Sequence, residues 1–222
     1  MKTSTHFSGL IPLWLKIAYT AFMAVLIPVY WYHYGPTNFL YFCDIALLLT
    51  LAGMWLESPL LISMPAVGIL LPQALWCLDY LVQLAGYTLT GMTAYMFDSA
   101  KPLFLRGLSL FHGWLPFLLV YLVFKVGYDK RALKGWTAAS MGLCLVAFFF
   151  LPKAGAALAD PNLPRNVNYV FGMNDAKPQT WMSPELYLLT WIAVLIIVVF
   201  VPTHFVLNKV CPSPEQAATK RA

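Results

Sequence analysis

The stretch Arg106-Gly-Leu-Ser-Leu-Phe-His112-Gly-Trp-Leu-Pro-Phe117 lies inside a hydrophobic run that is long enough to cross a membrane. It places an ionisable imidazole among apolar residues, where a neutral side chain would cost less free energy. His112 is the only one of the four histidines that lies more than about two helical turns from both ends of such a run. An ionisable group in this position is a functional hypothesis by default, and we expect its partner on another hydrophobic segment.

The composition places the chain among integral membrane proteins. Of the 222 residues, 60% are hydrophobic and 10% are charged, whereas soluble proteins carry about 25% charged residues. The net charge of +5 comes from Lys and Arg residues at the ends of apolar runs. Because they form no basic stripe, they indicate membrane topology and exclude a nucleic-acid partner. The four cysteines form no C-x-x-C pair, so we expect free thiols, no metal and no cofactor.

The fold class predicted from these runs is all-α, a polytopic bundle of six transmembrane helices in a single domain that covers residues 1–222. A span needs about 20 apolar residues to cross roughly 30 Å of hydrocarbon. The six expected spans are residues 11–32, 38–56, 60–84, 102–126, 135–151 and 185–207. The segment 152–184 is rich in proline and asparagine and is predicted to be an outer loop.

The distribution of Lys and Arg predicts the orientation. With a cytoplasmic N-terminus, the inner side of the six spans receives nine of the 14 basic residues, including Lys2, Lys220 and Arg221. The other side receives five. The positive-inside rule therefore favours cytoplasmic N- and C-termini, and we expect the bacterial cytoplasmic membrane.

Cys43, Asp44 and His112 are the candidate catalytic residues. A cysteine needs a base to become a nucleophile at neutral pH, because the thiolate is the reactive form. A histidine in apolar surroundings is disfavoured as imidazolium and so is available as a neutral base. Asp44, next to Cys43, could orient that imidazole or be held ionised by Arg106. All three fall in the outer half of the predicted bundle, and they can meet only if the second and fourth spans touch.

Four further residues are candidates for substrate binding. Arg106 lies one to two turns above His112, where its guanidinium could hold a lipid phosphate. Ser109 lies three residues before His112. Gln73 and Asn168 could donate hydrogen bonds to an oxyanion.

Each of these residues also has a structural interpretation. A cysteine inside a membrane helix is most often a small buried hydrophobe, which suits Cys43. Asp44 could simply pair with Arg106, and His112 could be hydrogen-bonding glue between helices. A metal site built from His33, Asp44 and His112 is a weaker alternative, because no two of them have the spacing of helical metal ligands.

Three short motifs carry a family resemblance over about residues 12–208. They are Thr37-Asn-Phe-Leu-Tyr-Phe-Cys43-Asp44-Ile, Leu108-Ser-Leu-Phe-His112-Gly and Asn166-Val-Asn-Tyr-Val-Phe-Gly172. Together they resemble a six-span superfamily. It contains the YwaF-type bacterial integral membrane proteins, the transmembrane acyltransferase of ether phospholipids and, more distantly, the androgen-induced threonine hydrolases of fatty-acid esters.

The resemblance implies lipid acyl chemistry. In the acyltransferase branch, a cysteine directly before Asn or Asp is the proposed nucleophile, and Cys43 occupies that place. A histidine followed by a small residue in a later span is its partner, and His112 matches it. The hydrolase branch uses a Thr three residues before the acidic position. That residue is Tyr41 here, so the chain departs from the threonine pattern.

We therefore expect a membrane-embedded enzyme of lipid metabolism, a thiol-dependent acyltransferase or lipid ester hydrolase. Cys43 and His112 would act on membrane lipids in the outer half of the bilayer. Two non-enzymatic alternatives stay open: an accessory subunit of a membrane complex, with a membrane-protein partner or a second copy of the chain, and a small-solute transporter. Transporters often show matched broken helices in two halves of the chain, and the prolines at 65, 72 and 116 are not matched in this way.

Overall fold

A computed structural model describes residues 9–219, and this part of the chain is helical without a β-strand. The long and medium helices are α1 (Leu13–Tyr34), α2 (Phe42–Leu56), α3 (Pro59–Leu84), α5 (Phe111–Val126) and α6 (Ala132–Phe150). The shorter ones are α4 (Leu103–Ser109), α7 (Pro184–Val194), α8 (Val201–Val210) and α9 (Pro214–Thr219). Three 3-10 turns, η1 (Pro36–Leu40), η2 (Ala94–Met96) and η3 (Val167–Tyr169), and a π-helix, η4 (Leu195–Phe200), complete the described elements.

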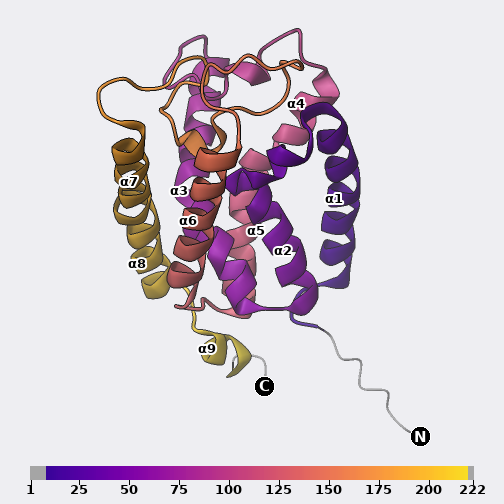
Figure 1. Ribbon diagram of the computed structural model, residues 1–222. Helices are drawn as coiled ribbons and strands as arrows, with labels where there is room; N and C mark the ends of the chain where they lie inside the picture. The colour runs from indigo at the N-terminus through magenta and orange to yellow at the C-terminus, as the bar shows by residue number, and fades with distance from the viewer. Residues whose placement is uncertain (1–8, 220–222) are drawn as a thin grey trace, which may run out of the picture.

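The helices stand side by side in one bundle, and the loops gather at its two ends (Figure 1). Helix α3 lies at the centre, packed against α2, α5, α6, η4 and α8. Helix α1 covers the outer side of α2, and α7, η4 and α8 form one continuous rod on the opposite side. The start of α1 and the end of α8 lie at the same end of the bundle as α9 (Figure 1).

Within residues 9–219, five helical stretches are long and apolar enough to cross a membrane, which indicates a multi-pass helical membrane protein. They are Leu13–Tyr34, Pro59–Leu84, Leu103–Val126, Ala132–Phe150 and Pro184–Thr219. The expected span 38–56 is represented by α2, which has 15 residues. At 1.5 Å per residue it is about 22 Å long, less than the roughly 30 Å of the hydrocarbon layer.

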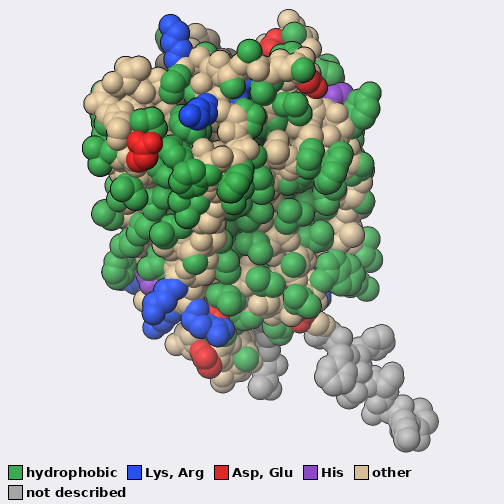
Figure 2. Space-filling model, viewed as in Figure 1, with side chains coloured by type: hydrophobic (Ala, Val, Ile, Leu, Met, Phe, Trp, Pro, Cys, Tyr) green, Lys and Arg blue, Asp and Glu red, His purple; other side chains and the backbone are tan. Residues whose placement is uncertain are grey.

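The surface fits this interpretation (Figure 2). Hydrophobic side chains form a belt around the middle of the visible face, and charged side chains gather mainly near the two ends. Of the basic residues counted for orientation, Lys2, Lys220 and Arg221 lie outside the described residues. At the end of the bundle near α9, Lys16 Nζ donates to Glu57 Oε1 over 2.7 Å, which neutralises a mostly buried amine.

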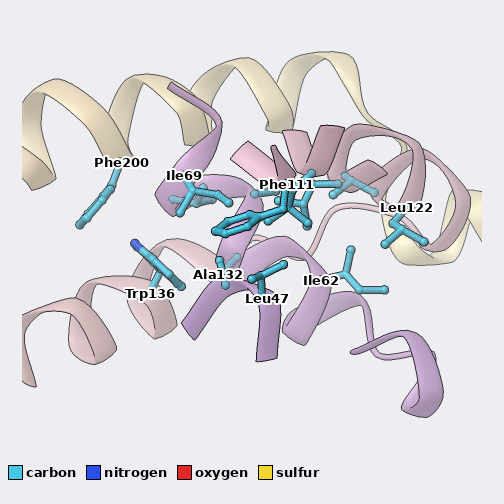
Figure 3. Close-up of a cluster of buried hydrophobic side chains, with 14 of the residues drawn as sticks. Leu47, Ile62, Ile69, Phe111, Leu122, Ala132, Trp136 and Phe200 are labelled. Carbon is cyan, nitrogen blue, oxygen red and sulfur yellow. The ribbon is translucent and has the colours of Figure 1, made fainter. Parts of the chain in front are cut away.

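The centre of the bundle depends on a close approach between α3 and α6. A Cβ atom at Gly68 would lie 1.8 Å from the Trp136 indole, so only glycine allows this ring to pack against α3. Trp136 is fully buried and makes edge contacts with Phe42 and Phe200. Figure 3 shows Trp136 and Phe200 in the same hydrophobic cluster as Leu47, Ile69 and Phe111.

Two irregularities interrupt the long helices. The expected span 102–126 is broken at Leu110, where α4 ends and α5 begins, so His112 lies in the first turn of α5. The expected span 185–207 contains the π-helix η4 between α7 and α8. Such π-helical segments are rare and occur frequently at functional sites.

Candidate functional site

A cavity of about 1140 Å³ opens in the half of the bundle that carries the 85–102 and 151–183 loops. Helices α1, α2, α3, α5 and α7, together with η4, contribute to its walls. Its polar and aromatic lining includes Tyr30, Asn38, Cys43, Asp44, Gln73, Trp76, Tyr95, Lys101, Ser109, His112, Arg165, Asn168 and Tyr169. Three predicted catalytic residues and three of the four predicted binding residues thus line one cavity, although α2 and α5 each pack mainly against α3, which separates Cys43 from His112.

Asn168 stabilises the start of α2, the helix whose first turn carries Cys43 and Asp44. Its side-chain amide accepts from Phe42 N over 3.0 Å and donates to Leu40 O over 2.9 Å, which bridges the junction between η1 and α2. Its backbone is left-handed, with φ 59°, a conformation that asparagine adopts more readily than most residues. Because both atoms of its amide are engaged with the backbone, Asn168 acts as the cap of α2.

Cys43 and Asp44 occupy the first turn of α2 and touch each other. The Cys43 thiol donates to Asp44 Oδ2 over 3.6 Å, and Asn38 Nδ2 donates to the same oxygen over 3.4 Å. Asp44 is only 3% exposed, and its Oδ1 has no hydrogen-bond partner among residues 9–219. Cys43 is half-buried and faces the cavity.

His112 is held by α3. Its Nδ1 lies 2.9–3.0 Å from the side-chain amide of Gln73, and its ring stacks on Trp76 at a centroid distance of 5.0 Å. The Nε2 atom has no hydrogen-bond partner in the described part of the chain. If Gln73 Oε1 accepts from Nδ1–H, then Nε2 carries the lone pair of a neutral imidazole. Gln73, rather than Asp44, is therefore the residue that orients His112.

The expectation that Asp44 pairs with Arg106 is wrong. Arg106 Nη1 donates to Met96 O over 3.0 Å, and Arg106 does not line the cavity. Ser109 Oγ is engaged with Tyr30 Oη over 2.8 Å and with Leu105 O. The cations at the cavity are instead Lys101, which stacks over Tyr34, and Arg165.

Asp79 fixes the loop that carries part of the cavity wall. Its carboxylate accepts hydrogen bonds from the backbone N–H groups of Thr90, Gly91 and Thr93 and from both threonine hydroxyls, over 2.6–3.2 Å. This loop supplies Met92, Tyr95 and Lys101 to the cavity. Asp79 is therefore an anchor for that wall.

The loop 151–183 supplies the opposite wall. Burial, reinforced by the charge of Asp175, raises the pKa of the Tyr169 phenol to about 12, so this cavity-lining group is neutral at physiological pH. Trp191 on α7 donates its indole N–H to Asn168 O over 2.8 Å and ties the loop to the bundle. Asn166 reinforces the turn through bonds to Gly172 O and Asp175.

Trp76, Tyr95 and Tyr30 are cavity residues that the sequence reasoning missed. Trp76 is the most informative, because its Nε1 is buried and has no acceptor in the described structure. It lies one turn before the Asp79–Gln83 pair, three residues after Gln73 and on the same face of α3. That spacing was the available signal, but aromatic residues are too common in membrane helices to stand out.

No protein-family model, curated protein or solved structure matches this chain. The resemblance to the six-span superfamily of YwaF-type proteins and acyltransferases therefore stays a prediction. What the chain does must be argued from the cavity itself.

Proposed function

We propose that the protein is a membrane-embedded thiol enzyme that transfers or hydrolyses lipid acyl groups, with Cys43 as the nucleophile. The observation that carries the proposal is that Cys43, Asp44 and His112 line one cavity whose remaining wall is largely hydrophobic. An accessory subunit has no need of such a cavity. The resemblance to acyltransferases points to the same chemistry through Cys43 and His112.

The first step is acylation of Cys43. The thiol proton passes to His112 Nε2, the ring nitrogen that Gln73 leaves without a partner. The sulfur then attacks the ester carbonyl of a lipid, and a tetrahedral intermediate forms. Its collapse breaks the carbon–oxygen bond, and the protonated base returns the proton to the leaving alkoxide. The products are an acyl thioester on Cys43 and a free lipid alcohol.

The second step releases the acyl group. A second lipid hydroxyl, or water, loses its proton to the same base and attacks the thioester carbonyl. The carbon–sulfur bond breaks, and the Cys43 thiolate takes the proton back. Transfer and hydrolysis therefore share one path and differ only in the attacking oxygen.

Two features assist this chemistry. Cys43 lies in the first turn of α2, where the helix dipole favours a negative charge on sulfur. The indole N–H of Trp76 is buried in the same cavity beside the Tyr95 hydroxyl, to which it makes no well-formed hydrogen bond, and it is our candidate for the oxyanion donor. Gln73 and Asn168 serve this role less well, because each amide already holds another residue.

We propose six membrane crossings, with α2 and the preceding turn η1 together forming the second. The N- and C-termini face the cytoplasm, and the cavity opens toward the opposite side of a bacterial cytoplasmic membrane. Nine of the 14 basic residues fall on the inner side in this arrangement. The cavity then meets the outer leaflet, where lipid substrates are available.

Purified protein in detergent micelles, assayed with a medium-chain p-nitrophenyl ester, tests the proposal. Cys43→Ala should lower turnover by about 10³-fold or more, because the nucleophile is lost. His112→Ala should lower it by about 10²-fold or more through loss of proton transfer. Cys144→Ala, which removes a buried thiol on α6, should leave turnover unchanged. Equal activity in Cys43→Ala and Cys144→Ala would exclude Cys43 as the nucleophile, and the absence of turnover in the wild type would leave the non-enzymatic alternatives.

A further inference from the structure

The cavity continues to the outer surface of the bundle between α3 and the α7–η4 rod. On the α3 side it is lined by Leu71, Leu75 and Leu78, and all three are exposed on the outside of the helix. On the other side it is lined by Leu195, Val198 and Val199. These six residues define what we call the lateral wall.

The lateral wall faces lipid. Val198 is 55% exposed and Leu75 is 41% exposed, although both also line the cavity. They belong to two of the stretches that are apolar enough to span a membrane. A side chain can be exposed on the outer surface and also line the cavity only where the cavity opens. The cavity therefore joins the hydrocarbon layer at the lateral wall.

The packing of α3 explains why the opening lies here. Helix α3 contacts η4 and α8 directly, and Trp136 and Phe200 fill the space beneath Gly68. Nearer the loops, α7 is held by packing against α6 and by the bond from Trp191 to Asn168. The separation between α3 and the rod therefore begins at the π-helix, where the backbone geometry changes.

We infer that the lateral wall is a portal through which a single hydrocarbon chain enters from the bilayer and lies with its polar end toward Cys43. The occupant is the aliphatic chain of a lipid, because every side chain of the lateral wall is Leu or Val. A water-soluble partner would find no hydrogen-bond donor or acceptor on these side chains. This inference rests on the proposed function for the identity of the reacting end, and it adds the route by which the hydrocarbon chain reaches Cys43.

Alkylation of Cys43 by N-alkyl maleimides tests the portal without requiring turnover. The protein is used in liposomes with Cys77, Cys144 and Cys211 replaced by Ala, so that Cys43 is the reacting thiol. N-hexadecyl maleimide partitions into the bilayer and reports the lateral route. N-ethyl maleimide is small and water-soluble and reports access from the loop end.

Val198→Trp places a large ring in the portal. Ile197→Trp is the matched control, because Ile197 is the adjacent residue, is 66% exposed and does not line the cavity. We expect Val198→Trp to slow alkylation by the hexadecyl reagent by about tenfold or more, and to change the ethyl reagent's rate by less than about twofold. Ile197→Trp should change neither rate. Leu75→Trp, with Leu81→Trp as its control, should repeat the result from α3.

Three results would overturn the portal. They are an unchanged hexadecyl rate in Val198→Trp, an equal slowing of both reagents, and an equal effect of Ile197→Trp. Failure of the proposed function looks different. In that case the alkylation pattern would hold while esters turned over equally in the Cys43→Ala variant.

Discussion

Two buried aspartates, Asp44 and Asp79, sit on neighbouring helices and have opposite hydrogen-bonding environments. Asp79 is fully buried and receives five hydrogen bonds from the 90–93 turn. Asp44 receives a long bond from Asn38 and a thiol contact from Cys43, and its Oδ1 receives none within the described structure. A buried carboxylate with all its donors holds a fold together, whereas one that lacks them keeps capacity for another molecule.

The same contrast in hydrogen bonding distinguishes two parts of the cavity wall, the 85–102 loop and the face formed by α2 and α3. The wall formed by the 85–102 loop is fixed, because Asp79 binds the turn that precedes Tyr95 and Lys101. The face formed by α2 and α3 retains an unsatisfied acceptor at Asp44 and an unsatisfied donor at Trp76. Unsatisfied buried groups cost folding free energy. Their presence beside Cys43 and His112 is what a site for substrate requires.

The largest effect that separates the two aspartates should be on stability. In Asp79→Asn, the side-chain NH₂ group would face backbone N–H donors, so we expect the free energy of unfolding to fall by about 3 kcal/mol. In Asp44→Asn, the loss should be below about 1 kcal/mol, because few native bonds are removed. Unfolding of both variants in mixed micelles, followed by circular dichroism against denaturant, measures the difference. Equal losses would mean that Asp44 is as structural as Asp79.

A smaller effect should appear at the other end of the bundle. Burial tends to raise the pKa of Glu57, but the hydrogen bonds from Lys16, Leu10 and Ile11 outweigh it, and the pKa is lowered. A carboxyl whose folded-state pKa is lowered adds stability that is present above its unfolded value of about 4.3 and is lost as the pH falls. Wild-type protein should therefore lose more stability than Glu57→Gln between about pH 6 and pH 3. Parallel pH profiles of the two melting temperatures would contradict this.

The sequence predicted the helical membrane bundle well, because spans of apolar residues are set by composition and length. The start and end of α3 lie within one residue of the expected segment 60–84. The second span was predicted too long, because 38–56 is mostly apolar while its first residues form η1. The fold begins α2 at Phe42 through the distant amide of Asn168, and no local pattern signals a cap that is 126 residues away.

The lining of the cavity was predicted in part, but the contacts among its residues were not. The cost of burying Cys43, Asp44 and His112 in apolar runs singled them out, and all three line the cavity. Their partners depended on tertiary packing. From the sequence, Arg106 was a possible partner of Asp44, and Asp44 was a possible partner of His112. In the structure, Arg106 bonds to Met96 O and His112 bonds to Gln73. The break at Leu110 and the π-helix η4 shape the site and carry no sequence signature.

The most direct test of the central claim is to trap the acyl group on Cys43. Protein incubated briefly with a long-chain p-nitrophenyl ester, quenched in acid and analysed by mass spectrometry should carry one acyl group on the peptide that contains Cys43. Neutral hydroxylamine should remove it, as expected for a thioester, and Cys43→Ala should carry none while Cys144→Ala does. Turnover of the ester without an adduct on Cys43, or with the same adduct in Cys43→Ala, would contradict the account.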